Sequence, residues 1–452
     1  MAMNDDALTP TYGGRWCSES IPKHQLPENT LLPETAYRIV MDELNLDGNP
    51  ALNLASFVST WMEPEAEKLF MHGATRNLVD QDEYPQLQLI EQRVIRMQAS
   101  LFNASDHDQP IGFTTVGSSE AIMLALLAHK WNWRAQREAA GLDSHRPNVV
   151  FGADAHTCWE KFARYFDVEM RCIPLQEDRY TINGADVMAH IDDNTIAVGA
   201  VIGTTFTGQM DDVVDINDRL IQHHQRTGQD IPIHVDAASG GFILPFVAPD
   251  FLWDFRLQQV RSINVSNHKY GLVYAGLGSV IFRDQQVLHK DLPFKVNYLG
   301  GEMENYSLNF SRSSAMLLVQ YYHFLRLGMD GYRRIIHQVM ENAHYLENRL
   351  LEQGVFQLLT DVKHLPVVVV RLMGQPSYTV FDLSDQLRKF GWIIPAYTLP
   401  SNACDISVMR MVVKENFSRD LADKLLEDIH QVVNRLSGSQ SPESRGGIHG
   451  VC

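Results

Sequence analysis

The sequence contains no long hydrophobic run, which argues against one large class of proteins. Its longest wholly apolar stretch, Ala121–Ala128, is far shorter than the roughly 20 residues that a membrane-spanning helix needs. The first residues include Asp5 and Asp6 and lack the apolar core of a secretory signal. We therefore expect a protein without a membrane span or signal peptide, located in the cytoplasm.

Cysteine is scarce. The five cysteines are odd in number and widely spaced, and no Cys-x-x-Cys pair occurs. This pattern argues against a disulfide framework and a zinc site, and it favours a reducing compartment. The pair His223-His224 lies in a polar helical stretch, Asp215–Thr227, where a solvated helix face is the simpler interpretation. We expect no metal site.

Positive charge is also in short supply. Lysine and arginine number 38 against 55 aspartates and glutamates, which gives a formal net charge of -17. An acidic chain of this kind disfavours nucleic acid as a partner. The length of 452 residues, with 45% hydrophobic and 21% charged residues, suits an ordinary globular protein of two or three domains.

What the sequence does have is a lysine directly after a strand. The residues Ser262–Val265 predict a short strand, and a polar segment from Ser266 to Lys269 follows it. Burial at such a strand end lowers the pKa of an amine and frees it to attack a carbonyl group. About thirty residues earlier, the predicted strand Ile231–Val235 leads to Asp236 and a loop of small residues. The pair suits pyridoxal phosphate, because the lysine can form an imine and the acid can keep the pyridine nitrogen protonated.

A candidate anion site lies further upstream. The segment Gly117–Glu120, which contains two serines, follows a strand-like Phe113–Val116 and precedes the helical stretch Ala121–Ala128. Free N–H groups at a helix start, together with two hydroxyls, can bind a phosphate group. Plain N-capping of the helix by a serine explains the same residues equally well.

Strands alternate with helices over residues 148–283, which predicts an α/β fold with a mostly parallel sheet covered on both faces. Ligands of such folds bind outside the carboxyl ends of the strands, where His156, Thr205, Asp236 and Lys269 all fall. Beyond a long helical region the pattern changes to a compact α+β unit. The expected divisions are an arm and helix in 1–50, a large domain in 51–340, a small C-terminal domain in 341–436 and a mobile tail in 437–452.

Several longer strings resemble glutamate decarboxylase of the bacterial and plant type, a branch of the pyridoxal-phosphate-dependent amino-acid decarboxylases. The resemblance runs from about Pro33 to Asp428. It implies the aspartate-aminotransferase fold, called fold type I, with a large domain and a smaller C-terminal α+β domain. The strings that carry it include Asp82-Glu-Tyr-Pro-Gln86, His234-Val-Asp-Ala-Ala-Ser-Gly-Gly-Phe242, His268-Lys-Tyr-Gly271 and Asn309-Phe-Ser-Arg312.

The resemblance implies roles at the cofactor. Lys269 would hold pyridoxal phosphate as an internal aldimine, and Asp236 would pair with its pyridine nitrogen. Ser118 and Ser119 would bind the phosphate group, with added contacts from the segment before the lysine. Ser266 and His268 would add contacts from the lysine segment, and Ser311 would do so from the neighbouring subunit. Thr205 would lie near the carboxyl-side oxygen of the ring, and Ala238 and His156 would pack on its two faces. The implied catalytic residues are Lys269, Asp236, His156 and Thr205.

The resemblance also implies a substrate site. Ser56, Phe57 and Asp80 would recognise the distal carboxyl group, partly across a subunit interface. Arg410 would bind the α-carboxylate, because a guanidinium fork suits two oxygens. A structural ion pair is the alternative for this arginine. The protein would then be a homodimer with shared active sites, or a hexamer built from such dimers.

The implied reaction is α-decarboxylation of L-glutamate to γ-aminobutyrate and carbon dioxide. Decarboxylation of another acidic amino acid, such as aspartate or cysteine sulfinate, is an alternative within the same fold. A catalytically silent protein that carries pyridoxal phosphate is an alternative of another class. An aminotransferase fits less well.

Some positions depart from the family pattern. His156 stands where this branch usually has glutamine, and Asn267 replaces a glycine, so the sequence leaves the effects of both open. The tail 437–452 has one arginine, no lysine and no tryptophan, and we expect no calmodulin binding. His449 lies close to the end, where it could close the site at neutral pH or simply be a free tail histidine.

Overall fold

The computed structural model describes residues 23–28, 30–105, 107–296 and 303–438. The chain divides into two units, one up to Leu52 and one from Asn53 onward. The first unit contains the predicted N-terminal helix, α1 (Pro33–Leu44), which begins with a proline in its first turn. Much of the predicted arm and all but the start of the tail, His449 included, lie outside the described residues. None of the described helices is long and apolar enough to cross a membrane.

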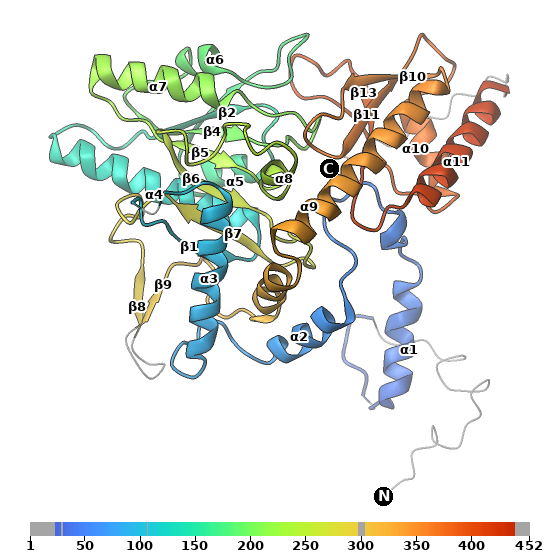
Figure 1. Ribbon diagram of the computed structural model, residues 1–452, viewed down its shortest axis with the longest axis horizontal. Coiled ribbons are helices and arrows are strands. Elements are labelled where there is room, and N and C mark those ends of the chain that lie inside the picture. Colours follow the sequence, from blue (N-terminus) through green and yellow to red (C-terminus); the bar gives the residue numbers. More distant parts are fainter. Residues whose placement is uncertain (1–22, 29, 106, 297–302, 439–452) are drawn as a thin grey trace, which may run out of the picture. The chain divides into compact units, whose positions relative to one another are not determined.

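A seven-stranded sheet forms the centre of the second unit (Figure 1). Its order is β1-β7-β6-β5-β4-β2-β3, and neighbours from β6 through β5, β4 and β2 to β3 are parallel. Only β7 runs against its two neighbours, β1 and β6, so the prediction of a mostly parallel sheet is confirmed. The strands are β1 (Ile111–Thr115), β2 (Asn148–Gly152), β3 (Glu169–Ile173), β4 (Thr195–Val201), β5 (Ile233–Asp236), β6 (Val260–Val265) and β7 (Gly278–Phe282).

Helices cover this sheet, and its central strands are largely buried for that reason. Every residue of β4 is buried, as expected of a strand that is covered on both faces. The helix α4 (Ser118–Ala139) packs against β4, β5, β6 and β7, while α3 (Pro85–Leu101) packs against β1. The remaining helices of this part are α2 (Pro64–Ala74), α5 (Cys158–Tyr165), α6 (Gly184–Met188), α7 (Val213–Thr227), α8 (Leu244–Val247) and the short 3-10 helix η5 (Gly240–Phe242).

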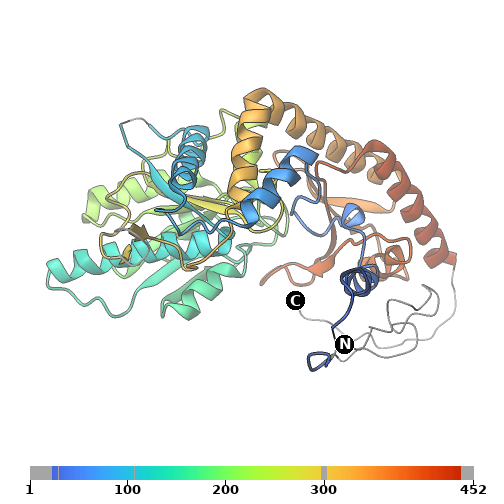
Figure 2. The same ribbon diagram turned by 90° about the horizontal axis from the view of Figure 1, so that it is seen from below.

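The long helix α9 (Ala315–Glu352) links the large domain to a second sheet (Figure 2). It packs against α2, α3 and α8 at one end and against β10, β11 and α11 at the other. A kink lies at Gly328, whose φ of 55° is a conformation that suits glycine. The predicted domain boundary near residue 340 falls inside this helix and stays a prediction.

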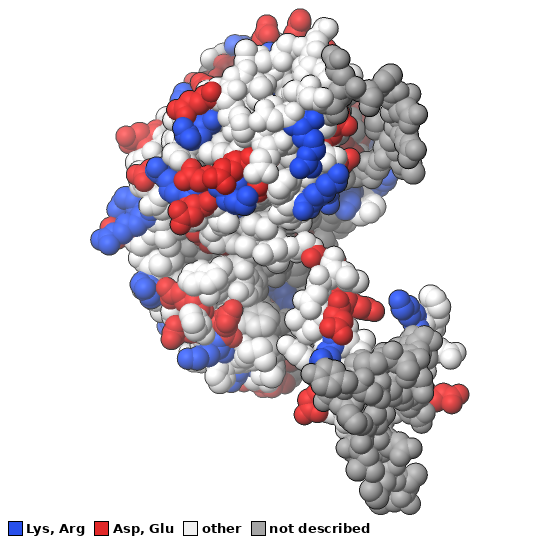
Figure 3. All heavy atoms as spheres, turned by 90° about the vertical axis from the view of Figure 1, so that its right-hand side faces the viewer, with Lys and Arg blue, Asp and Glu red and all other residues white. Residues whose placement is uncertain are grey.

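The small C-terminal domain contains a four-stranded antiparallel sheet of order β10-β11-β13-β12. Its elements are β10 (Phe356–Thr360), β11 (Val367–Leu372), α10 (Val380–Arg388), β12 (Ala396–Thr398), β13 (Ser407–Val412) and α11 (Arg419–Gly438). A two-stranded pair, β8 (Phe294–Val296) and β9 (Met303–Asn305), lies in the chain between β7 and α9. On the face drawn in Figure 3, acidic and basic side chains are interspersed over the described residues.

Candidate active site

A cavity of about 330 Å³ lies where the strands of the large sheet end. The chain segments that follow the carboxyl ends of β1, β2, β4, β5 and β6 all contribute to it, as expected for a parallel sheet. The structure therefore brings most of the predicted cofactor residues to one place. Those that line the cavity are Ser118, Ser119, His156, Thr205, Asp236, Ala238, Ser266, His268 and Lys269.

The amine of Lys269 is buried in this cavity. Its Nζ donates a hydrogen bond to Ser239 Oγ at 3.1 Å. Burial lowers the pKa of the lysine to about 8, although the nearby Asp236 opposes that shift. The main chain around the lysine is held by Ser59, whose N–H donates to His268 O at 2.9 Å and whose Oγ donates to Lys269 O at 2.7 Å. A fixed, buried amine with a lowered pKa can attack an aldehyde near neutral pH.

The carboxylate of Asp236 is surrounded by donors. Its Oδ1 accepts from Asn264 Nδ2 at 2.9 Å and from the N–H of Ala238 at 3.1 Å, and its Oδ2 accepts from Trp159 Nε1 at 3.1 Å. Trp159 reaches this point because α5 lies close to the sheet, where a Cβ on Gly199 of β4 would stand 2.4 Å from the indole ring. The donors fix the acid at the end of β5, facing the same cavity as Lys269.

The opposite end of the cavity has the features of an anion site. Gly117 is the N-cap of α4 and no side chain caps that helix, which counts against the interpretation of its serines as plain caps. Ser118 Oγ lies 2.7 Å from Ser266 Oγ, so two hydroxyls meet at the helix start. His268 Nδ1 is buried without a hydrogen-bond partner among the described residues. Burial and the adjacent Lys269 lower the pKa of His268 to about 4, and its ring is therefore neutral near pH 7.

These groups fit pyridoxal phosphate. A buried amine can react with its aldehyde, a carboxylate can pair with its ring nitrogen, and a helix start with two hydroxyls can bind its phosphate. His156 and Ala238 also line the cavity, and their places on the two ring faces stay a prediction. Burial lowers the pKa of His156, which favours a neutral ring.

Arg410, on β13, is buried close to this cavity. Its Nη1 donates to Thr205 O, and its Nη2 donates to Ala55 O at 2.6 Å. Its Nε is buried without a partner among the described residues. Both of these partners are main-chain carbonyls and no carboxylate pairs with the arginine among the described residues, which counts against a structural ion pair. A buried cation with a free donor suits an anionic ligand.

Phe57 lies between this arginine and the lysine. Its ring centroid is 4.9 Å from Lys269 Nζ and 5.1 Å from Arg410 Cζ, so the ring faces two cations. Ser56 Oγ accepts a hydrogen bond from the N–H of Val58 at 3.1 Å, which shapes the turn before the phenylalanine. Ser56, Phe57 and Arg410 are not among the residues that line the cavity, but Phe57 is close to Lys269, which does line it.

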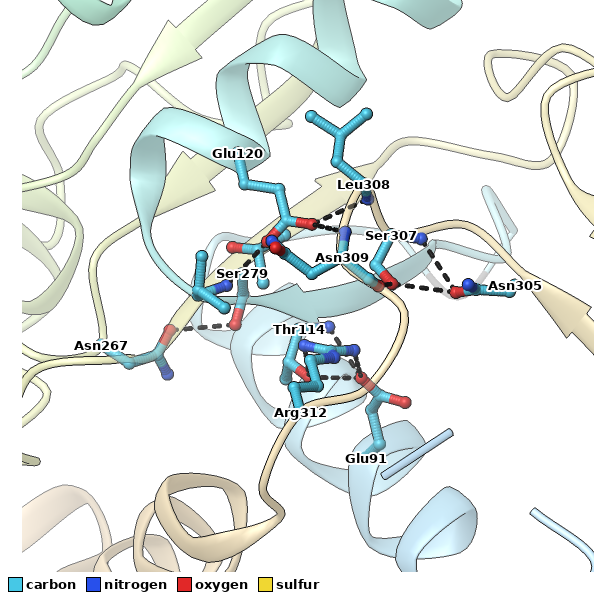
Figure 4. A network of polar contacts seen from close by, with 12 residues as sticks. Glu91, Thr114, Glu120, Asn267, Ser279, Asn305, Ser307, Leu308, Asn309 and Arg312 are labelled. Carbon is cyan, nitrogen blue, oxygen red and sulfur yellow. Dashed lines mark hydrogen bonds and ion pairs between the residues drawn. The ribbon is translucent and has the colours of Figure 1, made fainter. Parts of the chain in front are cut away.

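Asp80 and Ser311 do not line the cavity of their own chain. They lie near each other, because Asn77 Nδ2 is 3.3 Å from Asp80 Oδ1 and 3.3 Å from Ser311 Oγ. Figure 4 shows how the loop that carries Ser311 is fixed on either side. Glu120 accepts from the N–H groups of Leu308 and Asn309 at 2.8 and 3.3 Å.

On the other side of Ser311, Arg312 is bound by the large domain. Its Nη1 donates to Thr114 Oγ1 at 3.1 Å, and its Nη2 pairs with Glu91 Oε1 at 3.3 Å (Figure 4). The loop is therefore held by hydrogen bonds on both sides of Ser311, although Ser311 itself does not line the cavity. The predicted role of Ser311 and Asp80 in a neighbouring subunit stays a prediction.

Asn267, one of the departures from the family pattern, has a clear structural position. Its Nδ2 donates to Gln320 Oε1 at 2.9 Å, and its Oδ1 accepts from Ser279 Oγ at 2.9 Å (Figure 4). The side chain is fully buried and does not line the cavity. It fastens the lysine segment to α9 and β7.

Sequence reasoning missed Ser239, Trp159 and Asn264 as neighbours of the reactive groups. Ser239 was within reach, because it follows Asp236 in the same loop of small residues. Asn264 shares the alternation of polar and apolar residues in β6, and this pattern is visible in the sequence. Trp159 left no signal, since its contact with the acid depends on how α5 packs against the sheet.

Comparison with known proteins agrees with this geometry. Residues 22–373 match the family model described as the pyridoxal-dependent decarboxylase conserved domain. Glutamate decarboxylase 5 of Arabidopsis thaliana is 47% identical over 440 residues, which cover 97% of this chain and 89% of that protein. The glutamate decarboxylase of Aliivibrio fischeri is 43% identical over 458 residues, which cover 99% and 98%.

Solved structures give the same result. A glutamate decarboxylase from Lactobacillus brevis matches with a TM-score of 0.93 at 42% sequence identity, covering 96% of this chain and 100% of that one. A sphingosine-1-phosphate lyase from Burkholderia pseudomallei matches with a TM-score of 0.77 at 20% identity. At that identity the second match shows a likeness of fold alone.

Proposed function

Because the chain belongs to the pyridoxal-dependent decarboxylase family, we propose that it converts L-glutamate to γ-aminobutyrate and carbon dioxide. The observation that carries the proposal is the single cavity in which Lys269 and Asp236 meet a helix-start anion site. The relatives, which are glutamate decarboxylases over nearly their whole length, support the choice of substrate.

Bound pyridoxal phosphate supplies an aldehyde for the amines and a ring that accepts the electron pair of the bond that breaks at Cα. Lys269 provides the amine that holds the cofactor and gives way to the substrate amine. The carboxylate of Asp236 provides the negative charge opposite the ring nitrogen. Ser118, Ser119 and Ser266 bind the phosphate, which orients the ring.

Arg410 binds the α-carboxylate that will leave. The carbonyl oxygens of Thr205 and Ala55 fix its guanidinium group, so the direction of its remaining donor is set before the substrate arrives. The ring of Phe57 contributes an apolar surface close to both the lysine and the arginine. This arrangement favours one orientation of the bond from Cα to the carboxylate.

When carbon dioxide leaves, a proton must replace it at Cα. Lys269 Nζ carries protons inside the cavity, and its contact with Ser239 Oγ keeps it positioned there. Each turnover therefore consumes one proton. Thr205 and His156 border the same space and complete the proposed catalytic set.

The distal carboxyl group of glutamate needs a second site. We assign it to Ser56, Phe57 and Asp80, with Asp80 supplied by a neighbouring subunit, which would also bring Ser311 to the cofactor. The absence of Asp80 and Ser311 from the residues that line their own cavity, together with the hydrogen bonds that hold them near each other, supports this assignment. It requires at least a homodimer, and a hexamer would satisfy it as well. The cytoplasmic location and the absence of calmodulin binding also remain predictions from the sequence.

One assay tests the substrate. The purified protein is incubated with pyridoxal phosphate and an equal mixture of glutamate, aspartate and cysteine sulfinate, and the amine products are quantified. We expect γ-aminobutyrate as the main product. A main product from aspartate or cysteine sulfinate would replace the substrate, and no product from any of the three would favour the catalytically silent alternative.

A further inference from the structure

A continuous series of buried side chains lies behind Asp236. Asn264 joins the acid to His234, with His234 Nε2 at 2.9 Å from Asn264 Oδ1. His234 Nδ1 lies 2.8 Å from Ser262 Oγ, and Ser262 Oγ lies 2.8 Å from His129 Nε2 on α4. All five side chains are buried, with exposed fractions of 0–3%.

The hydrogen bonds of this series run in one direction. A carboxylate only accepts, so Asn264 must turn its Nδ2 toward Asp236 and its Oδ1 toward His234. His234 Nε2 then carries a proton. A neutral imidazole has one N–H, so its Nδ1 accepts from the hydroxyl of Ser262, and that oxygen accepts from His129. Burial lowers the pKa of His234 to about 4 and that of His129 to about 3, which keeps both rings neutral.

The sheet places these groups in one row. His234 pairs with Ser262 and Asp236 pairs with Asn264 in the parallel register of β5 and β6. Side chains two residues apart point to the same face, so the four form a polar ladder that α4 covers. Apolar residues would fill such a position with less desolvation cost, so the ladder requires a reason other than packing.

The far end of the row reaches a second cavity. His129 lines a polar recess of about 190 Å³ together with Asp230, Arg261 and Asp284. The row therefore spans the large domain from the cofactor cavity to this recess. Its donors all point toward Asp236, and aligned hydrogen bonds strengthen one another.

We propose that His129, Ser262, His234 and Asn264 are positioning residues that direct a one-way chain of hydrogen-bond donors onto Asp236, and so hold its negative charge opposite the ring nitrogen of pyridoxal phosphate. The inference rests on the proposed function, because it assigns that partner to Asp236. Asn264 acts directly on the acid. The other three residues act through it by fixing which way the amide faces.

The first test needs no cofactor. Nitrogen-15 spectra of histidine-labelled full-length protein, assigned with His129→Gln and His234→Gln, report which ring nitrogen carries the proton. We expect both rings to be neutral with the proton on Nε2. A proton on Nδ1 of either ring, or a doubly protonated ring near pH 7, would contradict the proposed direction of the hydrogen bonds.

The second test interrupts this series of hydrogen bonds. His234→Leu fills the site but removes the donor that fixes Asn264, whereas His234→Gln keeps one donor and one acceptor. We expect the dissociation constant for pyridoxal phosphate to rise about tenfold in His234→Leu, the cost of about one charged hydrogen bond. We expect His234→Gln to stay within about threefold of the wild type, and the visible absorbance band of the bound cofactor to shift only in His234→Leu.

Ser262→Ala is a milder change, because it removes only the hydroxyl between His129 and His234. Ser384→Ala is its matched control. Ser384 is likewise a buried serine, but its hydroxyl donates to Ile394 O at 2.6 Å and it lies on α10, outside this series. If His234→Leu fails to fold, the two serine variants decide. A weaker cofactor affinity in Ser262→Ala than in Ser384→Ala supports the proposed positioning role, and equal affinity in the two variants contradicts it. If the wild type binds no pyridoxal phosphate, the proposed function fails. The nitrogen spectra still test the direction of the hydrogen bonds by themselves.

Discussion

The ring end and the substrate end of the active site are built in opposite ways. At the ring end, around Asp236, every contact comes from adjacent strands, from α5 or from the next residues of the loop, all within the large domain. At the substrate end, the segment around Phe57 and the strand of Arg410 come from far apart in the chain, and Asp80 lies outside the cavity. The contacts around Asp236 thus lie within one large domain, whereas we propose that a neighbouring subunit completes the substrate end.

The largest expected effect comes from removing the reactive amine at the ring end. Lys269→Ala should abolish the visible absorbance of the bound cofactor and reduce decarboxylation to the detection limit, because no other amine occupies that position. Absorbance and carbon dioxide release measure the two effects. Lys389→Ala, an exposed lysine on the small domain, is the control that should behave as the wild type. Retained turnover in Lys269→Ala would make the assigned chemistry wrong.

The next effect should separate the two ends. Arg410→Lys keeps a positive charge but loses the fork that reaches both carbonyl oxygens and a substrate carboxylate. We expect kcat/KM for glutamate to fall about 100-fold, which corresponds to about 2.7 kcal/mol. The affinity for pyridoxal phosphate should change less than about threefold. Steady-state kinetics measures kcat/KM, and cofactor titration measures the affinity for pyridoxal phosphate. An equal loss in both quantities would mean that Arg410 does not act at the substrate end alone.

A mixing experiment tests whether the substrate end is shared between subunits. Lys269→Ala and Asp80→Ala should each be inactive alone. When the two variants are unfolded and refolded together, some dimers will carry both changes on one side and an intact site on the other. We expect a fraction of the wild-type activity to return. No recovery, with dimer formation verified, would place Asp80 in the site of its own chain or outside any site.

The two ends also differ in how much the sequence could reveal. Parallel α/β topology brings all strand ends to one edge, so Lys269, Asp236 and Ser118 could be placed together from the strand pattern alone. The contacts of Trp159 and His129 could not, because they depend on how α5 and α4 pack across the sheet. The domain boundary predicted near residue 340 stays a prediction, since α9 continues through that position as one long helix.

The smallest effect concerns stability near the cavity. Asp154, between β2 and His156, is buried, and neither of its side-chain oxygens has a hydrogen-bond partner among the described residues. Burial and the charge of Asp211 raise its pKa well above the usual value. Burial also raises the pKa of Asp211 to about 7, although its carboxylate accepts from two main-chain N–H groups.

The sign of the pH dependence follows from these shifts. An acid whose pKa is raised in the folded state binds its proton more tightly there, so its contribution to stability is largest below the unfolded pKa and is lost as pH rises through the folded pKa, which for Asp154 lies well above the usual value. Asp154→Asn removes one such group without breaking a hydrogen bond. The melting temperature of the variant relative to the wild type should therefore rise by about 1–4 °C between pH 5 and pH 8. Asp405→Asn, at an exposed position, is the control and should show no such trend. If the melting-temperature difference between Asp154→Asn and the wild type were also independent of pH, Asp154 would ionise as freely as an acid in water.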